Sequence, residues 1–116
     1  MNPRILVDSR LLEGDAYLRK VVEFIIQHYK PIEIYLFGSK ARGDDGPNSD
    51  YDLLVVVRDR VSREKRNRFH ALRPKLGLTK AIDVVIFSKD GFESRLDVKT
   101  SLPSTVIGEG KLLYAA

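Results

Sequence analysis

Residues 32–57 read IEIYLFGSKARGDDGPNSDYDLLVVV and contain two apolar stretches separated by a loop rich in Gly and Asp. The first, Ile32 to Phe37, and the second, Tyr51 to Val57, are rich in β-branched and aromatic residues and are apolar on nearly both faces of an extended chain. This pattern is typical of central strands that are covered on both sides. The stretch from Ala81 to Phe87, AIDVVIF, fits the same description. The sequence therefore predicts at least three strands.

Helices are predicted before, between and after these strands. Residues 16–30 follow Asp15, a suitable N-cap, and repeat apolar residues at helical spacing until Pro31. Residues 62–76 form a second helical pattern with a narrow apolar stripe, which Pro74 is expected to end or kink. A last helix is expected within residues 90–106, although Pro103 interrupts it. The order of elements predicts a small α/β domain with helices packed against a sheet. The pattern does not decide whether the sheet is parallel, antiparallel or mixed.

Length and composition narrow the class of protein. The 116 residues suit a single domain covering residues 1–116, and 43 % hydrophobic with 31 % charged residues is typical of a soluble globular protein. The absence of cysteine excludes disulfides, cysteine-ligated zinc and cysteine nucleophiles. No window has the roughly 18 consecutive apolar residues of a membrane span. The first residues do not have the pattern of a signal peptide, so we expect a cytoplasmic protein without membrane association.

The formal net charge of +4 conceals an uneven distribution. Residues 58–80 hold nine basic side chains against two acidic ones, a local net charge of +7. Just upstream, four acidic residues fall within nine positions: Asp44, Asp45, Asp50 and Asp52. An acidic site beside a basic strip suggests anionic ligands, whereas the plainer interpretation of the strip is a solvated helix face.

The loop after the first predicted strand has the composition of a phosphate site. Gly38 allows the backbone to approach a ligand closely, and a short helix beginning at Ser39 would direct N–H groups and a hydroxyl toward it. Taken alone, Gly38-Ser39 favours the plainer interpretation of a tight turn in which Lys40 and Arg42 are surface charges.

Three aspartates at predicted strand ends could hold a metal ion. Asp50 and Asp52 are two residues apart, so their side chains share one face of a strand and repel each other unless a cation lies between them. Mg²⁺ is such a cation, because it binds one or two carboxylates together with substrate phosphates. Asp83 lies near the start of the third strand, and if that strand neighbours the second, it completes a cluster able to hold two ions. Solvated turns and a water-facing strand end are the alternatives.

Taken together and in order, these motifs resemble the nucleotidyltransferase superfamily that includes DNA polymerase β. The resemblance rests on Gly38-Ser39, Ala41-Arg42-Gly43, Ser49 to Leu53, and Asp83 in a third strand, and it extends to the closing motif Glu109 to Tyr114. The short chain is most similar to the minimal nucleotidyltransferase (MNT) domains of prokaryotes. The resemblance implies the polymerase β-like α+β fold, with a small mixed sheet of three or more strands.

The resemblance also implies a role for each motif residue. Gly38 and Ser39 would hold the triphosphate, and Arg42 would contact phosphate or brace the loop. Asp50 and Asp52 correspond to the metal-bridging carboxylates, and Asp83 to a third that helps activate the acceptor hydroxyl. The implied cofactor is Mg²⁺, as two ions. Lys40 occupies a position where the family often has arginine.

The implied activity is transfer of a nucleoside monophosphate, AMP from ATP, to a hydroxyl with release of pyrophosphate. Minimal domains of this type are associated with a small helical HEPN protein. The resemblance implies that the HEPN protein is a toxin and that the MNT domain is its antitoxin, which adenylylates it. The alternative is a non-catalytic antitoxin or binding module that neutralises a partner by contact. A nucleic-acid binder that uses the basic strip is less favoured, because the strip lacks interleaved aromatic residues. Homo-oligomerisation is left open.

Overall fold

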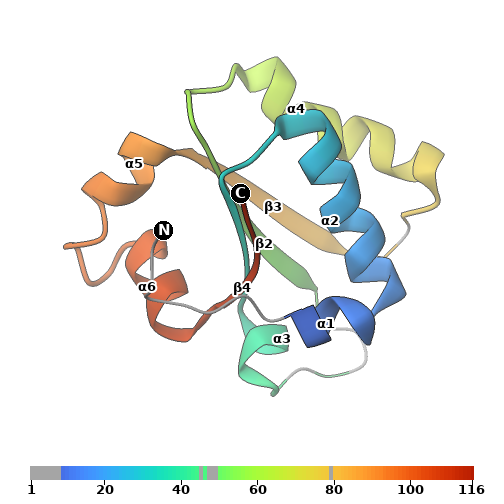
Figure 1. Cartoon of the computed structure of the whole chain (residues 1–116), viewed down its shortest axis with the longest axis horizontal. Helices are drawn as coiled ribbons and strands as arrows, with labels where there is room; N and C mark the ends of the chain where they lie inside the picture. The colour runs from blue at the N-terminus through green and yellow to red at the C-terminus, as the bar shows by residue number, and fades with distance from the viewer. Residues whose placement is uncertain (1–8, 45, 47–49, 79) are drawn as a thin grey trace.

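Four strands form one sheet in the order β3-β2-β1-β4 in the computed structural model, which describes residues 9–44, 46, 50–78 and 80–116 (Figure 1). The inner strands are β1 (Glu33–Phe37) and β2 (Tyr51–Val57), and the edge strands are β3 (Ile82–Ser88) and β4 (Lys111–Ala115). β1 is antiparallel to both β2 and β4, whereas β2 and β3 are parallel. The sheet is therefore mixed, which confirms the fold that the resemblance implied.

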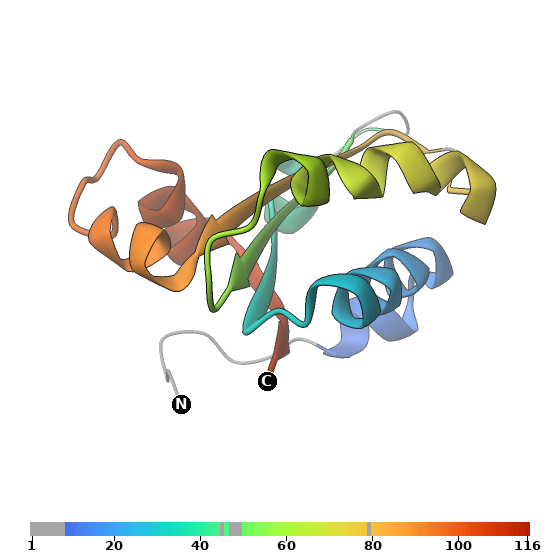
Figure 2. The ribbon, with the colours of Figure 1, turned by 90° about the horizontal axis from the view of Figure 1, so that it is seen from above.

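Helices cover both faces of this sheet (Figure 2). One face packs against α1 (Ser9–Glu13), α2 (Ala16–Tyr29) and α4 (Arg63–Leu72), the last continued by the 3₁₀ helix η1 (Arg73–Leu76). The other face packs against α5 (Lys89–Ser94) and α6 (Leu102–Glu109). The four-residue helix α3 (Ser39–Arg42) follows β1 directly. Among the described residues, no helix is long and apolar enough to cross a membrane.

The helix predicted over residues 16–30 is confirmed in both its start and its end. The carboxylate of Asp15 accepts a hydrogen bond from the backbone N–H of Leu18 at 3.0 Å, which satisfies a first-turn donor. The helix ends at Lys30, which has φ of 48° in the left-handed region immediately before Pro31. The side of α2 that packs on the sheet buries six side chains: Leu18, Val21, Val22, Phe24, Ile25 and Tyr29.

The basic segment forms the predicted helix, and it is anchored by few side chains. Ser62 caps α4 by accepting a hydrogen bond from Lys65 N–H at 3.1 Å, and the helix tightens into η1 at Arg73, just before Pro74. Within residues 63–72 of α4, Phe69 is the one residue that is buried. The Tyr29 hydroxyl donates to the Lys65 carbonyl at 2.6 Å and accepts from Phe69 N–H at 3.2 Å, so it joins α2 to α4.

The structure differs from the expectations at three places in the second half of the chain. The single helix expected over residues 90–106 is two helices, α5 and α6. Pro103 lies in the first turn of α6, where its missing N–H removes no hydrogen bond of the helix, so it starts a new helix. β4 was not predicted as a strand. β3 was expected to be covered on both sides, yet it is an edge strand, with residues 84–88 only partly buried.

We predict that Tyr29→Phe lowers the free energy of unfolding by about 1–2 kcal/mol, because it removes both hydrogen bonds between α2 and α4 from a buried position. Tyr17→Phe is the matched control, since its hydroxyl donates one exposed hydrogen bond to the Lys80 carbonyl. Urea denaturation monitored by circular dichroism would measure both variants. Equal losses for the two variants would contradict the role given to Tyr29.

Candidate active site

The strand register brings two of the predicted aspartates together. In the parallel pair of β2 and β3, Asp52 is directly opposite Asp83, and neighbouring strands lie about 4.8 Å apart. On the other side of β2, Asp52 is the partner of Phe37 in the antiparallel pair with β1. Asp50 precedes β2 and is exposed. The structure therefore places Asp52 between the end of β1 and the start of β3.

Gly38 makes room for the Asp52 carboxylate. It has φ of 77°, a conformation that favours glycine, and it is the N-cap of α3. A Cβ atom added there would collide with the Oδ2 atom of Asp52. The glycine of the predicted phosphate loop and the aspartate of the predicted metal site are thus in direct van der Waals contact.

The electrostatics of the site link all three aspartates. Partial burial raises the pKa of the Asp52 carboxyl above its ordinary value, and the charges of Asp83 and Asp50 raise it further. Arg42 acts in the opposite direction and lowers the pKa of Asp52. The ionised site therefore carries repulsion that a bound cation would relieve.

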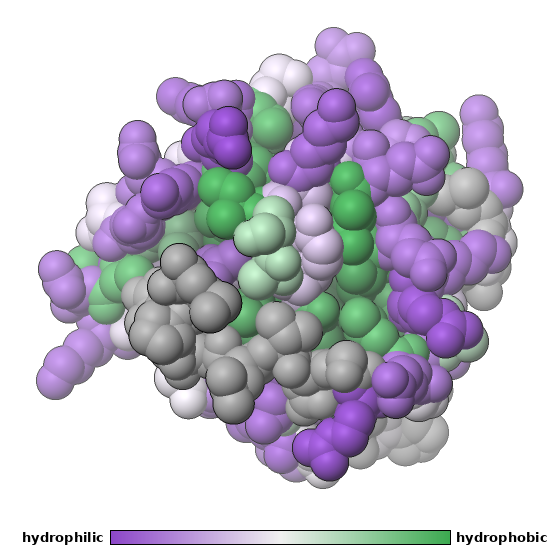
Figure 3. All heavy atoms as spheres, viewed as in Figure 1, coloured by the Kyte–Doolittle hydropathy of each residue, from purple (hydrophilic) through white to green (hydrophobic). Residues whose placement is uncertain are grey.

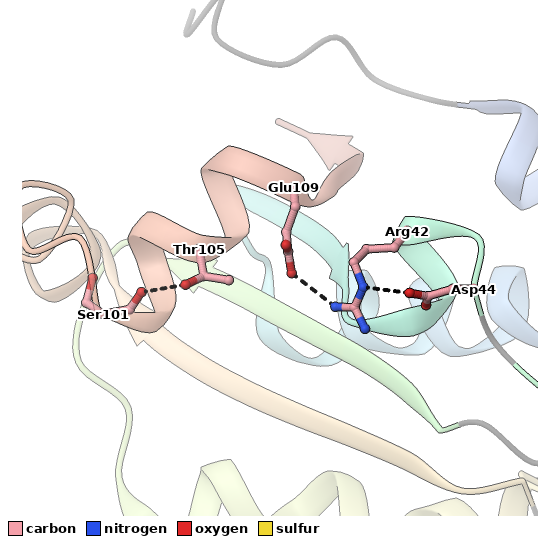
Figure 4. Close-up of polar contacts among 5 residues, drawn as sticks. All are labelled: Arg42, Asp44, Ser101, Thr105 and Glu109. Atoms are coloured by element: carbon pink, nitrogen blue, oxygen red, sulfur yellow. Dashed lines mark hydrogen bonds and ion pairs between the residues drawn. The ribbon is translucent and has the colours of Figure 1, made fainter.

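Arg42 forms two ion pairs, one within the loop and one with the end of α6. Its Nε donates to Oδ2 of Asp44 and its Nη1 donates to Oε1 of Glu109, both at 3.2 Å (Figure 4). Asp44 also closes the end of α3, because its N–H donates to the Ser39 carbonyl at 3.1 Å. Sequence analysis did not assign a role to Glu109.

The carboxylates fit a magnesium ion that completes its coordination with other oxygens. Among residues 9–44, 46, 50–78 and 80–116, no group of three or more His, Cys, Asp or Glu side chains is arranged to hold a metal ion by itself. Mg²⁺ does not need such a group, since it typically takes one or two carboxylates, substrate phosphates and water. Asp52 and Asp83 in register supply two hard oxygen donors next to the loop, with the Asp50 charge close by.

Comparison with known proteins was made against family models, curated sequences and solved structures. Residues 18–112 match the model of the nucleotidyltransferase domain. The chain belongs to the nucleotidyltransferase domain family. The match includes every residue that sequence analysis assigned to the site. No curated protein sequence is similar enough to this one to count as a match.

Three solved structures illustrate how the nucleotidyltransferase fold is shared. One chain of a toxin-antitoxin structure with AMP-PNP is 26 % identical to this one. Its TM-score is 0.60 over 84 % of this chain and 73 % of that chain. A nucleotidyltransferase from Sulfolobus solfataricus is 20 % identical, with a TM-score of 0.58 over 86 % and 78 %. A chain in the structure of a tri-AMPylated Shewanella oneidensis HEPN toxin in complex with MNT antitoxin is 21 % identical to this one. Its TM-score is 0.57 over 87 % of this chain and 71 % of that chain. The family match confirms the resemblance to nucleotidyltransferases, and these likenesses show that the fold is shared with toxin-antitoxin structures.

Two hollows open on the surface of this nucleotidyltransferase domain, one near α3 and one at the opposite end of β2. A hollow of about 240 Å³ adjoins α3 and is lined by Arg10, Leu11, Gly14, Asp15, Leu36, Lys40 and Tyr51. A larger one, of about 510 Å³, lies at the opposite end of β2, where its lining includes Val57 and Lys65. Neither is lined by Asp50, Asp52 or Asp83. Asp50 and Asp83 are exposed and Asp52 is half-buried, so solvent reaches the site where β2 and β3 begin.

The basic segment is mostly exposed, as predicted. Most of the charged side chains of α4 and η1 are solvent-accessible, and hydrophilic residues gather along the top and right of the molecule in Figure 3, over α2 and α4. Predictions that involve Asp45, Ser49 and the side chain of Leu76 lie outside the described residues.

We predict that Gly38→Ala destabilises the protein by about 2 kcal/mol or more, because it combines left-handed backbone strain with a clash against Asp52. Gly43→Ala is the control: its φ is 81°, yet nothing lies within 4 Å of the added Cβ, so it should cost about 1 kcal/mol of backbone strain alone. Thermal denaturation would compare the two. A Gly38→Ala protein as stable as Gly43→Ala would contradict the close contact.

We predict that Asp52→Asn stabilises the metal-free protein at pH 7, by roughly 0.2–1 kcal/mol. The folded-state pKa of Asp52 is raised, so its ionised form disfavours folding above that pKa. The gain should disappear as the pH falls below the unfolded value of about 4, where the wild-type carboxyl is protonated in both states. Denaturant titrations with EDTA at pH 7 and pH 3 would measure it. An Asp52→Asn protein that is less stable than wild type at pH 7 would contradict the repulsion.

Proposed function

We propose that this domain transfers AMP from ATP to a hydroxyl of a partner protein, and that the partner is a helical HEPN-type toxin. The observation that carries the transferase part is the register of Asp52 opposite Asp83 beside Gly38. The partner part is supported by the likeness to a toxin-antitoxin structure with AMP-PNP and to a complex that contains a tri-AMPylated HEPN toxin.

The proposed reaction is a displacement at the α-phosphorus of ATP. The acceptor hydroxyl oxygen forms a bond to that phosphorus, and the bond from the phosphorus to the oxygen that bridges the α- and β-phosphates breaks. Pyrophosphate leaves with the electron pair, and the hydroxyl proton passes to a carboxylate of the site. The products are an AMP ester of the partner and pyrophosphate.

Each residue of the site has a part in this proposal. Asp50, Asp52 and Asp83 would hold Mg²⁺, which when bound neutralises phosphate charge and polarises the reacting oxygens. Asp83 is exposed at the start of β3, so it can accept the acceptor proton and release it to water. Gly38 and Ser39 hold the triphosphate at the start of α3, and Arg42 offers its guanidinium to the same phosphates.

The basic surface formed by α4 and η1 is the proposed place to look for partner contacts. It is held to the body of the protein by Phe69 and Tyr29, and its arginine and lysine side chains largely face solvent. An acidic protein surface would complement it. A nucleic-acid function is less favoured, because Phe69 is fully buried and unable to stack on a base.

The test is label transfer from α-³²P-ATP, with Mg²⁺, to a candidate helical HEPN-type protein. We expect Asp50→Asn/Asp52→Asn to reduce the transfer rate by about 10²–10⁴-fold, because the variant removes two metal-holding carboxylates. Asp90→Asn/Asp97→Asn is the matched control, since it removes two exposed carboxylates on and after α5 and should retain the wild-type rate. EDTA should abolish transfer in every variant.

Two results would overturn the proposal. Label transfer that survives in Asp50→Asn/Asp52→Asn would show that these carboxylates do not carry the chemistry. Full neutralisation of the partner by this variant without any label transfer would instead support the non-catalytic binding module.

A further inference from the structure

The closing motif of the chain lies against the nucleotide-binding loop. In the antiparallel pair of β1 and β4, Leu36 is the partner of Lys111. Glu109 is the last residue of α6 and lies two positions before Lys111, so the start of β4 brings it near the end of β1, where the loop begins. α6 ends at this point, and the Gly110 N–H donates to the Val106 carbonyl at 2.7 Å.

The end of α6 is also held tightly in place. A Cβ atom added to Gly110 would lie 3.0 Å from the Leu36 carbonyl oxygen and would also collide with the carbonyl of Val106. The backbone at this turn therefore contacts β1 directly, so Glu109 projects from a fixed position. Figure 4 shows its side chain reaching from the last turn of α6 toward Arg42.

Asp44 and Glu109 together fix two of the three nitrogens of the Arg42 guanidinium. Nε is used by Asp44 and one hydrogen of Nη1 by Glu109. Nη2 points away from both carboxylates, and within the described part of the chain it has no hydrogen-bond acceptor (Figure 4). A guanidinium presents five N–H donors in a rigid plane, so fixing Nε and Nη1 sets the direction of Nη2.

These contacts contribute little to stability. The Arg42, Asp44 and Glu109 side chains are 44 %, 61 % and 40 % exposed, and ion pairs with such exposure are weak. Their consequence is positional, because a free arginine side chain samples many rotamers and loses that freedom when it binds a phosphate. Holding it in advance lowers the cost of binding.

We propose that Glu109 is a positioning residue for nucleotide binding, which acts by holding the Arg42 guanidinium beside the Gly38–Ser39 loop with its Nη2 edge directed to the phosphates. This inference rests on the proposed function, because it names a determinant of nucleotide affinity at the same site. It also gives a physical role to the closing motif, which the proposed reaction leaves unused.

Isothermal titration calorimetry with AMP-PNP and Mg²⁺ tests the proposal. We expect Glu109→Ala to weaken binding about threefold to tenfold, with Glu109→Gln in between because its amide oxygen still accepts a hydrogen bond. Thr105→Ala is the matched control on the same helix, since its hydroxyl bonds only the Ser101 carbonyl, and it should bind as wild type does. In an Arg42→Ala background, Glu109→Ala should have no further effect, because Glu109 acts through Arg42.

A second readout does not depend on nucleotide. The ¹⁵N NMR signal of the Arg42 Nε–Hε group should shift and broaden in Glu109→Ala, and should stay unchanged in Thr105→Ala. Wild-type affinity in Glu109→Ala, tighter binding, or an unchanged Nε signal would each overturn the role of Glu109 while leaving the transferase intact. A wild-type protein that binds no AMP-PNP would overturn the proposed function together with this inference.

Discussion

The burial of β2 on both of its faces is the constraint on which the rest of the structure depends. Five consecutive residues, Leu53 to Val57, are at most 3 % exposed, because α2 and α4 cover one face and α5 and α6 cover the other. Such a strand must satisfy its backbone groups through pairing, and β1 and β3 provide that on its two sides. Asp52 lies where the buried run begins, so the core of the protein fixes the position of the candidate active site.

A charged carboxylate at the start of a buried strand costs free energy. A carboxyl that is partly buried next to two others is disfavoured as an ion, which is why the pKa of Asp52 is raised. The protein does not relieve this with a lysine or arginine bonded to Asp52 in the described residues, and the Arg42 side chain is directed to Asp44 and Glu109 instead. The repulsion therefore remains available to favour a cation and its phosphate ligands.

Sequence analysis located the parts of this site that depend on local pattern. Gly38 could be singled out because it follows an apolar strand, and Asp52 and Asp83 because each interrupts one. The cap at Asp15 could be predicted because its position before α2 is a local signal. The strand order was not available from periodicity, since a buried strand has the same composition whether its neighbour is parallel or antiparallel. β3 was mistaken for a central strand because its sequence is apolar on both faces. In the structure these apolar residues are half-covered at an edge of the sheet rather than fully buried.

The contact between Glu109 and Arg42 could not be predicted for a different reason. The two residues are 67 positions apart, and the pairing of β1 with β4 brings them together. β4 itself was missed, and without its register Glu109 is one exposed acid among many. Once Leu36 is paired with Lys111, however, Glu109 must lie near the end of β1, because it ends α6 only two positions before Lys111. Long-range polar contacts at the edge of a sheet are thus consequences of strand register, and they become predictable only after the strands have been paired.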